Sequence, residues 1–136
     1  MQEITVNTSA DQVRQVTELA DLQLAETGCS ARVKMQIDIA IDEIFSNIAR
    51  YAYQQETGSV TVRIDTLDDP SRILLTFIDN GIPYNPLTKE MPDTTSLPAR
   101  KRPIGGLGLF MVKKTMDSVT YSFENGQNIL TLLKNL

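Results

Sequence analysis

The sequence of 136 residues contains no histidine, no tryptophan and one cysteine. Without histidine, the chain cannot form a Ser-His-Asp triad, a Cys-His protease pair or a zinc site that uses imidazole. The single cysteine, Cys29, excludes an internal disulfide and a CxxC metal or redox site. Catalytic chemistry must therefore come from carboxylates, amides, hydroxyls, backbone groups, cations or a bound metal ion.

Long apolar runs are also missing, since none approaches the ~20 residues that a membrane-spanning helix needs. The first residues, MQEITVNTSADQ, have neither the basic start nor the apolar stretch of a signal peptide. We therefore expect a cytoplasmic protein with no membrane partner. The net charge of −4 and the pI near 4.8 argue against direct binding of nucleic acid.

Hydrophobic periodicity predicts two amphipathic helices near the N-terminus and a strand-rich remainder. The expected helices cover 9–28 and 30–53, and the expected strands cover 3–8, 60–64, 73–78, 119–123 and 129–133. Ser9 and Ser30 are expected to cap the helices, and Asn125-Gly126 is typical of a hairpin turn. This order predicts an α/β (α+β) two-layer sandwich, in which helices cover one face of a mixed, mainly antiparallel sheet.

Residues 82–104 form an unusual segment, because they hold five of the six prolines and show no clear periodicity. A connection of this length is typical of a functional lid or a disordered loop. No repeat or linker divides the chain, so we expect one domain over 1–136.

The first candidate motif is Glu43 with Asn47, four residues apart and hence on one helix face. A carboxylate and an amide placed together could hold Mg²⁺ and a nucleophile side by side. The alternative is an ordinary solvated helix flank.

The second motif is Asp79-Asn-Gly81, which directly follows an apolar strand. A carboxylate at a strand end can accept a hydrogen bond from the exocyclic amine of adenine, while it repels the oxygen at that position of guanine. The pattern thus favours ATP over GTP, and the alternative is an ordinary turn.

The third motif is Gly105-Gly106-Leu107-Gly108, which precedes a helical pattern. Backbone N–H groups at such a helix start can bind an anion, although the GK[ST] ending of a P-loop is missing. The alternative is a flexible hinge. Arg100, Lys101 and Arg102 lie just before it and could contact phosphates or simply be solvated.

Together and in this order, the three motifs resemble the ATP-binding domain shared by gyrase, a heat-shock chaperone, histidine kinases and MutL. Within that superfamily, the chain is most similar to the stand-alone anti-sigma factor serine/threonine protein kinases. The similar phrases are DEIFSNIARYAY (42–53), IDNGIPYNP (78–86) and IGGLGLFMVKKTMD (104–117). The resemblance implies a histidine-kinase-type ATPase fold over 1–136, with an ATP lid at about 82–104.

Carried over residue by residue, the resemblance implies roles for most of the residues named above. Asn47 would coordinate Mg²⁺, Glu43 would be the general base, and Asp79 would bind the adenine amine, with Gly81 admitting the base. The lid and the phosphate-binding helix start would be formed by Gly105, Gly106, Leu107 and Gly108, with Arg100 and Lys101 near the phosphates. Thr131 would support the adenine side, and Tyr51 replaces a histidine that is common in this branch.

The implied activity is phosphorylation of a serine or threonine on a small antagonist protein, with Mg·ATP as donor. Such relatives also bind a sigma factor and dimerise through the N-terminal strand and first helix, so a homodimer is expected. Three alternatives remain open: a nucleotide-gated binding module without phosphoryl transfer, a slow ATPase switch, and a plain interaction domain whose motifs coincide by chance.

Overall fold

The computed structural model describes residues 1–54, 56–88 and 106–136. Five strands form one sheet in the order β1-β2-β3-β5-β4. The strands are β1 (Gln2–Asn7), β2 (Ser59–Leu67), β3 (Arg72–Asp79), β4 (Ser118–Glu124) and β5 (Gln127–Asn135). The helices are α1 (Val13–Ala25), α2 (Ala31–Asn47) and α3 (Gly106–Thr115), and the short turns are η1 (Ala10–Gln12), η2 (Ile48–Ala52) and η3 (Pro86–Thr88).

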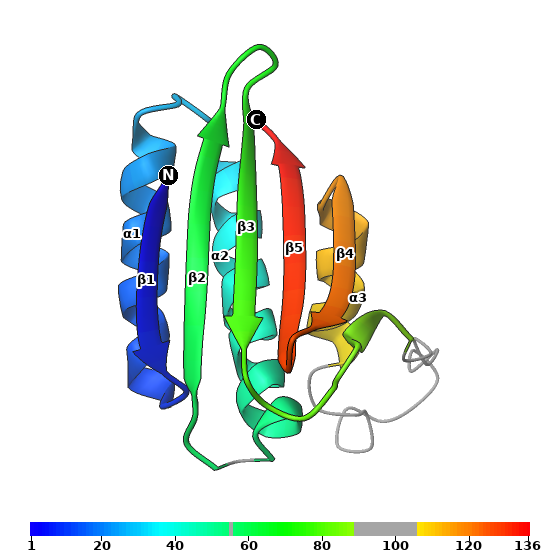
Figure 1. Ribbon diagram of the computed structural model, residues 1–136. Helices are drawn as coiled ribbons and strands as arrows, with labels where there is room; N and C mark the ends of the chain where they lie inside the picture. Colours follow the sequence, from blue (N-terminus) through cyan, green and yellow to red (C-terminus); the bar gives the residue numbers. More distant parts are fainter. Residues whose placement is uncertain (55, 89–105) are drawn as a thin grey trace, which may run out of the picture.

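All three α-helices lie on the same face of the sheet (Figure 1). Side chains in the central strands alternate accordingly, as in β3, where Ile73, Leu75 and Phe77 are buried against the helices. These side chains pack with buried residues of α1 and α2 in one hydrophobic core. The predicted two-layer α+β sandwich is confirmed.

Each pairing between the described strands is antiparallel. The β4–β5 hairpin turns at Asn125 and Gly126, both with positive φ, as the Asn-Gly pair predicts. β5 then returns between β3 and β4, so it is antiparallel to both neighbours. In this register Asp79 at the end of β3 faces Asn128 near the start of β5.

The two predicted helix caps have different outcomes. Ser30 caps α2, because its Oγ accepts the N–H of Val33 at 3.2 Å. Ser9 makes no side-chain cap; its backbone carbonyl instead accepts the N–H of Gln12 in η1, and α1 begins only after that turn. The predicted side-chain cap at Ser9 is therefore wrong.

The second helix is not one continuous α-helix to Tyr53. The α-helical segment ends at Asn47, and η2 continues it as a π-helical turn in which Tyr53 N–H donates to Ile48 O at 3.1 Å. A π-turn widens the helix by a residue and changes the direction of the side chains that follow. Within the described ranges, no helix has the length and apolar character needed to cross a membrane.

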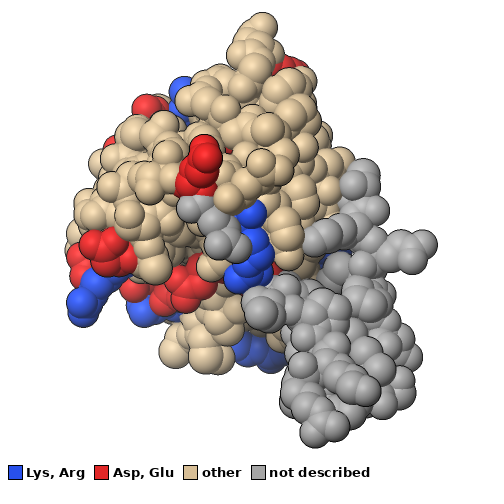
Figure 2. Space-filling model, turned by 90° about the horizontal axis from the view of Figure 1, so that it is seen from below, with Lys and Arg blue, Asp and Glu red and all other residues tan. Residues whose placement is uncertain are grey.

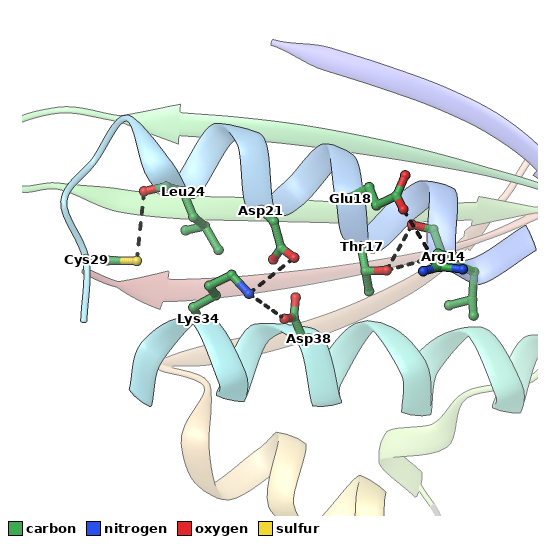
Figure 3. A network of polar contacts seen from close by, with 9 residues as sticks. Arg14, Thr17, Glu18, Asp21, Leu24, Cys29, Lys34 and Asp38 are labelled. Carbon is green, nitrogen blue, oxygen red and sulfur yellow. Dashed lines mark hydrogen bonds and ion pairs between the residues drawn. The ribbon is translucent and has the colours of Figure 1, made fainter. Parts of the chain in front are cut away.

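A polar cluster joins α1 to α2 (Figure 3). Lys34 Nζ lies 3.3 Å from Asp21 Oδ2 and 3.4 Å from Asp38 Oδ2, while the Oδ1 atoms of both aspartates are buried and find no hydrogen-bond partner among the described residues. Burial, together with the neighbouring Asp21, raises the pKa of Asp38 to about 6 against the attraction of Lys34. Asp38 therefore binds its proton more tightly in the folded state than in the unfolded state.

This shift predicts that the contribution of Asp38 to stability is fully present below its unfolded pKa. It is lost as the pH rises through about 6, because the folded state then gives up a proton that it held more tightly. Asp38→Asn cannot ionise, so its urea midpoint should fall less than that of the wild type between pH 5 and pH 7.5. Asp42→Asn, an exposed change on the same helix, is the control. Identical pH dependence in the wild type and Asp38→Asn would contradict the assignment.

Candidate functional site

A pocket opens at the end of the sheet where β3 stops and β5 begins, against the C-terminal end of α2. Its apolar wall includes Ile44, Ile48, Ala52 and Leu130, and its polar side chains are Asn47, Asp79, Tyr84, Tyr121 and Asn128; Pro86 completes it. The structure thus brings Asn47 of the first motif and Asp79 of the second to one pocket. A ligand with a flat apolar ring and one polar edge would match this combination of apolar walls and a few polar side chains.

Asp79 is the buried carboxylate of this pocket, with 2% of its surface exposed. Its Oδ1 accepts the N–H of Gly81 at 2.9 Å and a side-chain N–H of Asn128 at 2.9 Å. Burial raises the pKa of Asp79, and these two donors oppose that rise. Since both protein donors among the described residues bind Oδ1, Oδ2 is the oxygen that can accept from a ligand.

Asn128 supports Asp79 from β5 and is itself 4% exposed. Besides the bond to Asp79, its Nδ2 donates to Ile82 O at 2.8 Å, and its Oδ1 accepts the N–H of Tyr84 at 3.0 Å and the O–H of Tyr121. No sequence motif surrounds Asn128, so sequence reasoning missed it. The one available signal was its position two residues after the hairpin glycine.

Gly81 allows the chain after β3 to approach η2. A Cβ at this position would lie 2.5 Å from Ala52 O, and the neighbouring Ile82 N–H donates to that same oxygen at 2.9 Å. The glycine is therefore required for backbone contact between the two walls of the pocket.

Glu43 and Asn47 lie together as their spacing predicts, with Asn47 Nδ2 donating to Glu43 Oε1 at 3.3 Å. Asn47 is 4% exposed, whereas Glu43 is only half-buried. Burial raises the pKa of Glu43, opposed by the Asn47 bond, the charge of Arg50 and the N–H of Leu109. A carboxylate with a raised pKa is a stronger base than a solvated one.

Gly108 brings the third motif against the first. A Cβ on Gly108 would lie 2.1 Å from Glu43 Oε2, so α3 can approach the carboxylate only because this residue has no side chain. The next residue, Leu109, directs its N–H to the Glu43 carboxylate. The start of α3 and the end of α2 therefore meet at Glu43.

Arg50 and Tyr51 are site neighbours that the sequence motifs did not single out for binding. The guanidinium carbon of Arg50 lies 5.7 Å from the centre of the Tyr51 ring, and Tyr51 stacks on Tyr84 at 4.9 Å. Arg50 Nη1 is buried and has no hydrogen-bond partner within the described part of the chain. The spacing of seven residues from Glu43 to Arg50, two helical turns, was the signal that could have linked them.

The structure does not bring Thr131 to this pocket. Thr131 pairs with Thr76 and Thr120 on the face of the sheet that the helices leave uncovered, whereas Asn128 and Leu130 face the helices. The β5 residue that lines the pocket and contacts Asp79 is therefore Asn128, and Thr131 is not among the lining residues. Gly106 and Leu107 begin α3, while Gly105, Arg100, Lys101, Arg102 and the lid residues from 89 onward lie outside the described residues.

The pair Glu43 and Asn47 fits a magnesium ion by its donor chemistry. Carboxylate and amide oxygens are the hard ligands that Mg²⁺ takes, usually with waters and substrate phosphates completing its shell. The side-chain nitrogen of Asn47 is a donor, here to Glu43, so the amide oxygen of Asn47 is the atom that could coordinate the ion. Among the described residues, no group of three or more acidic or cysteine side chains forms a separate metal site.

Charges of both signs surround this end of the molecule. Figure 2, which looks onto it, shows Lys and Arg side chains interspersed with Asp and Glu side chains on the described surface.

Comparison with known proteins places this geometry in a family. Residues 6–134 match the model of the histidine kinase-like ATPase domain. The chain belongs to this family. Membership agrees with a pocket that Asn47 and Asp79 of the first two motifs line, and with the contact of Gly108 against Glu43, and it supports the resemblance that the motifs suggested.

Two relatives with similar sequences have names more specific than that of the family. The serine-protein kinase RsbW of Bacillus mycoides strain KBAB4 is 28% identical over 121 residues, which cover 82% of this chain and 74% of that relative. RsbW of Bacillus cereus strain Q1 is 27% identical over the same coverage. A crystal structure of the RsbU and RsbW domains of Rv1364c from Mycobacterium tuberculosis shares the fold, with a TM-score of 0.65 and 18% identity; the chain spans 33% of that protein's chain.

The contact between Gly108 and Glu43 predicts energetic coupling between the two positions. In the wild type, Gly108→Ala should displace the Glu43 carboxylate and break its bonds to Asn47 and Leu109. In a Glu43→Ala background, the added methyl group meets no carboxylate. A double-mutant cycle measured by urea unfolding should therefore give a coupling energy of about 1 kcal/mol. Additive effects would contradict the contact, and Met111→Ala, exposed on the same helix, is the control for substitution in α3.

Proposed function

We propose that this protein is an ATP-dependent serine/threonine protein kinase of the anti-sigma factor type. The observation that carries the proposal is the meeting of Glu43, Asn47 and the start of α3 beside a pocket with a buried carboxylate. The relatives named serine-protein kinase RsbW support the same activity.

The pocket provides an adenine site. Its apolar wall would sandwich the base, and Asp79 Oδ2 would accept from the exocyclic amine, since Oδ1 already accepts from Gly81 and Asn128. Asn47 lines the same pocket, so the phosphates would extend from the base toward Asn47 and Glu43. Backbone N–H groups at the start of α3 would then face their negative charge.

Phosphoryl transfer needs a base for the attacking hydroxyl. Glu43 would accept the hydroxyl proton of a serine or threonine while that oxygen forms its bond to the γ-phosphorus, and the bond to ADP breaks. The Asn47 bond and the Leu109 N–H hold the carboxylate in place for this step. Mg²⁺, held through Asn47, would neutralise charge on the phosphates.

The resemblance to anti-sigma kinases supplies the partners. The protein substrate would be a small antagonist protein, and a sigma factor would be the second partner. A homodimer formed through β1 and α1 and a cytoplasmic location belong to the same proposal. Neither nucleic acid nor a membrane is a partner in it.

Asp79→Asn should weaken ATP binding about 10- to 100-fold, as expected for a lost charge-assisted hydrogen bond. The N–H groups of Gly81 and Asn128 would claim the single oxygen of the substituted amide, so its NH₂ group would face the adenine amine, donor against donor. Titration calorimetry measures the effect, with Asp68→Asn in the exposed β2–β3 turn as control. Unchanged affinity would exclude Asp79 as the adenine acceptor.

Glu43→Gln should leave ATP affinity near that of the wild type and slow phosphoryl transfer about 10²- to 10⁴-fold, the usual effect of losing a general base. The measurement is transfer of labelled γ-phosphate from Mg·ATP into proteins of a host-cell extract. Glu26→Gln, exposed at the end of α1, is the matched control.

The outcome also separates the alternatives. One labelled small protein, present with the wild type and absent with Glu43→Gln, would establish the kinase and identify its substrate. Free phosphate without labelled protein would indicate an ATPase switch. ATP binding with neither product would indicate a nucleotide-gated binding module.

A further inference from the structure

The amide of Asn128 makes four hydrogen bonds, which is the full capacity of its two N–H groups and of the two lone pairs on its oxygen. Nδ2 donates to Asp79 Oδ1 and Ile82 O, and Oδ1 accepts from Tyr84 N–H and Tyr121 O–H. A buried amide in this state has one orientation, because reversing it would place its oxygen against two acceptors.

Within the described residues, Tyr121 supplies the one side-chain donor to the Asn128 oxygen. Its strand, β4, pairs in register with β5, and Tyr121 lies opposite Leu130. The other donor is the backbone N–H of Tyr84, and both tyrosines line the pocket. Burial raises the pKa of the Tyr121 phenol, so the hydroxyl keeps its proton and remains a donor. The sheet therefore holds the amide in place through Tyr121.

The orientation of Asn128 decides what Asp79 offers to a ligand. With an N–H directed at Oδ1, the Asp79 carboxylate is stabilised as an ion and Oδ2 is an acceptor. When that donor is weakened or reversed, the buried carboxyl is stabilised with its proton. A protonated Asp79 can donate to the oxygen of guanine as readily as it accepts from the amine of adenine.

We propose that Tyr121, acting through Asn128, is a positioning residue that makes the pocket selective for a purine with an amine at position 6. This inference rests on the proposed function, because it presumes that a purine nucleotide occupies the pocket. It concerns β4 and β5, which lie outside the three sequence motifs.

The test uses a ligand without the amine. The affinities of the wild type for ATP, GTP and purine riboside triphosphate, which has hydrogen in place of the 6-amino group, are compared by calorimetry. Tyr121→Phe should reduce the preference for ATP over the other two about three- to tenfold, as for one lost neutral hydrogen bond. Asn128→Asp, which has the same shape without the donor, should bring the preference for ATP over GTP close to one at pH 8.

Tyr53→Phe is the matched control. The Tyr53 hydroxyl also connects two backbone groups, accepting from Asn80 N–H at 2.8 Å and donating to Ser59 O at 2.7 Å, but it does not touch Asn128. Its loss should lower the affinity for all three nucleotides by the same factor. Thermal melting of every variant identifies a loss that comes from unfolding.

Two results would overturn the inference. If Tyr121→Phe keeps the wild-type preference, or lowers all three affinities equally as Tyr53→Phe does, then Tyr121 is only structural. If the wild type binds ATP and the purine analogue equally, then the amine is not recognised. A wild type that binds no nucleotide would instead refute the proposed function itself.

Discussion

The site depends on the carboxylate of Asp79, which is buried where β3 ends and β5 begins. Asp79 is 2% exposed, and an ion at that depth persists only if donors replace the water that it lost. Gly81 and Asn128 are those donors, from the chain after β3 and from β5. The register that places Asp79 opposite Asn128 therefore supplies one of the two donors that the buried carboxylate needs.

A second constraint acts at the end of α2, where the same side chains must pack in the core and line the pocket. Ile44 and Ile48 are buried, and both also line the pocket wall. The π-turn that follows Asn47 changes the direction of the next side chains. It accompanies the stacking of Tyr51 on Tyr84, from the segment that follows β3.

Much of this arrangement follows from local patterns in the sequence. Alternation predicts the strands, Asn125-Gly126 predicts the hairpin, and the spacing of Glu43 and Asn47 predicts their contact. Other features depend on contacts between distant segments. The apolar spacing in the sequence shows no break where the π-turn begins, so it could not predict that turn. Ser9 has the residue type of a helix cap, but its side chain makes no cap hydrogen bond.

The exchange of Thr131 for Asn128 shows why residue type alone misleads on a strand. The two positions are three apart, and side chains of a strand alternate between faces with a period of two. An odd separation therefore puts one beside Asp79 and the other on the uncovered face, next to Thr76. The β3–β5 register decides which of the two residues lies beside Asp79. That register is set by the hairpin and by burial of the strand face that carries Leu130. A family role can thus be assigned to a strand residue only when it is known whether that residue lies on the same sheet face as a buried neighbour.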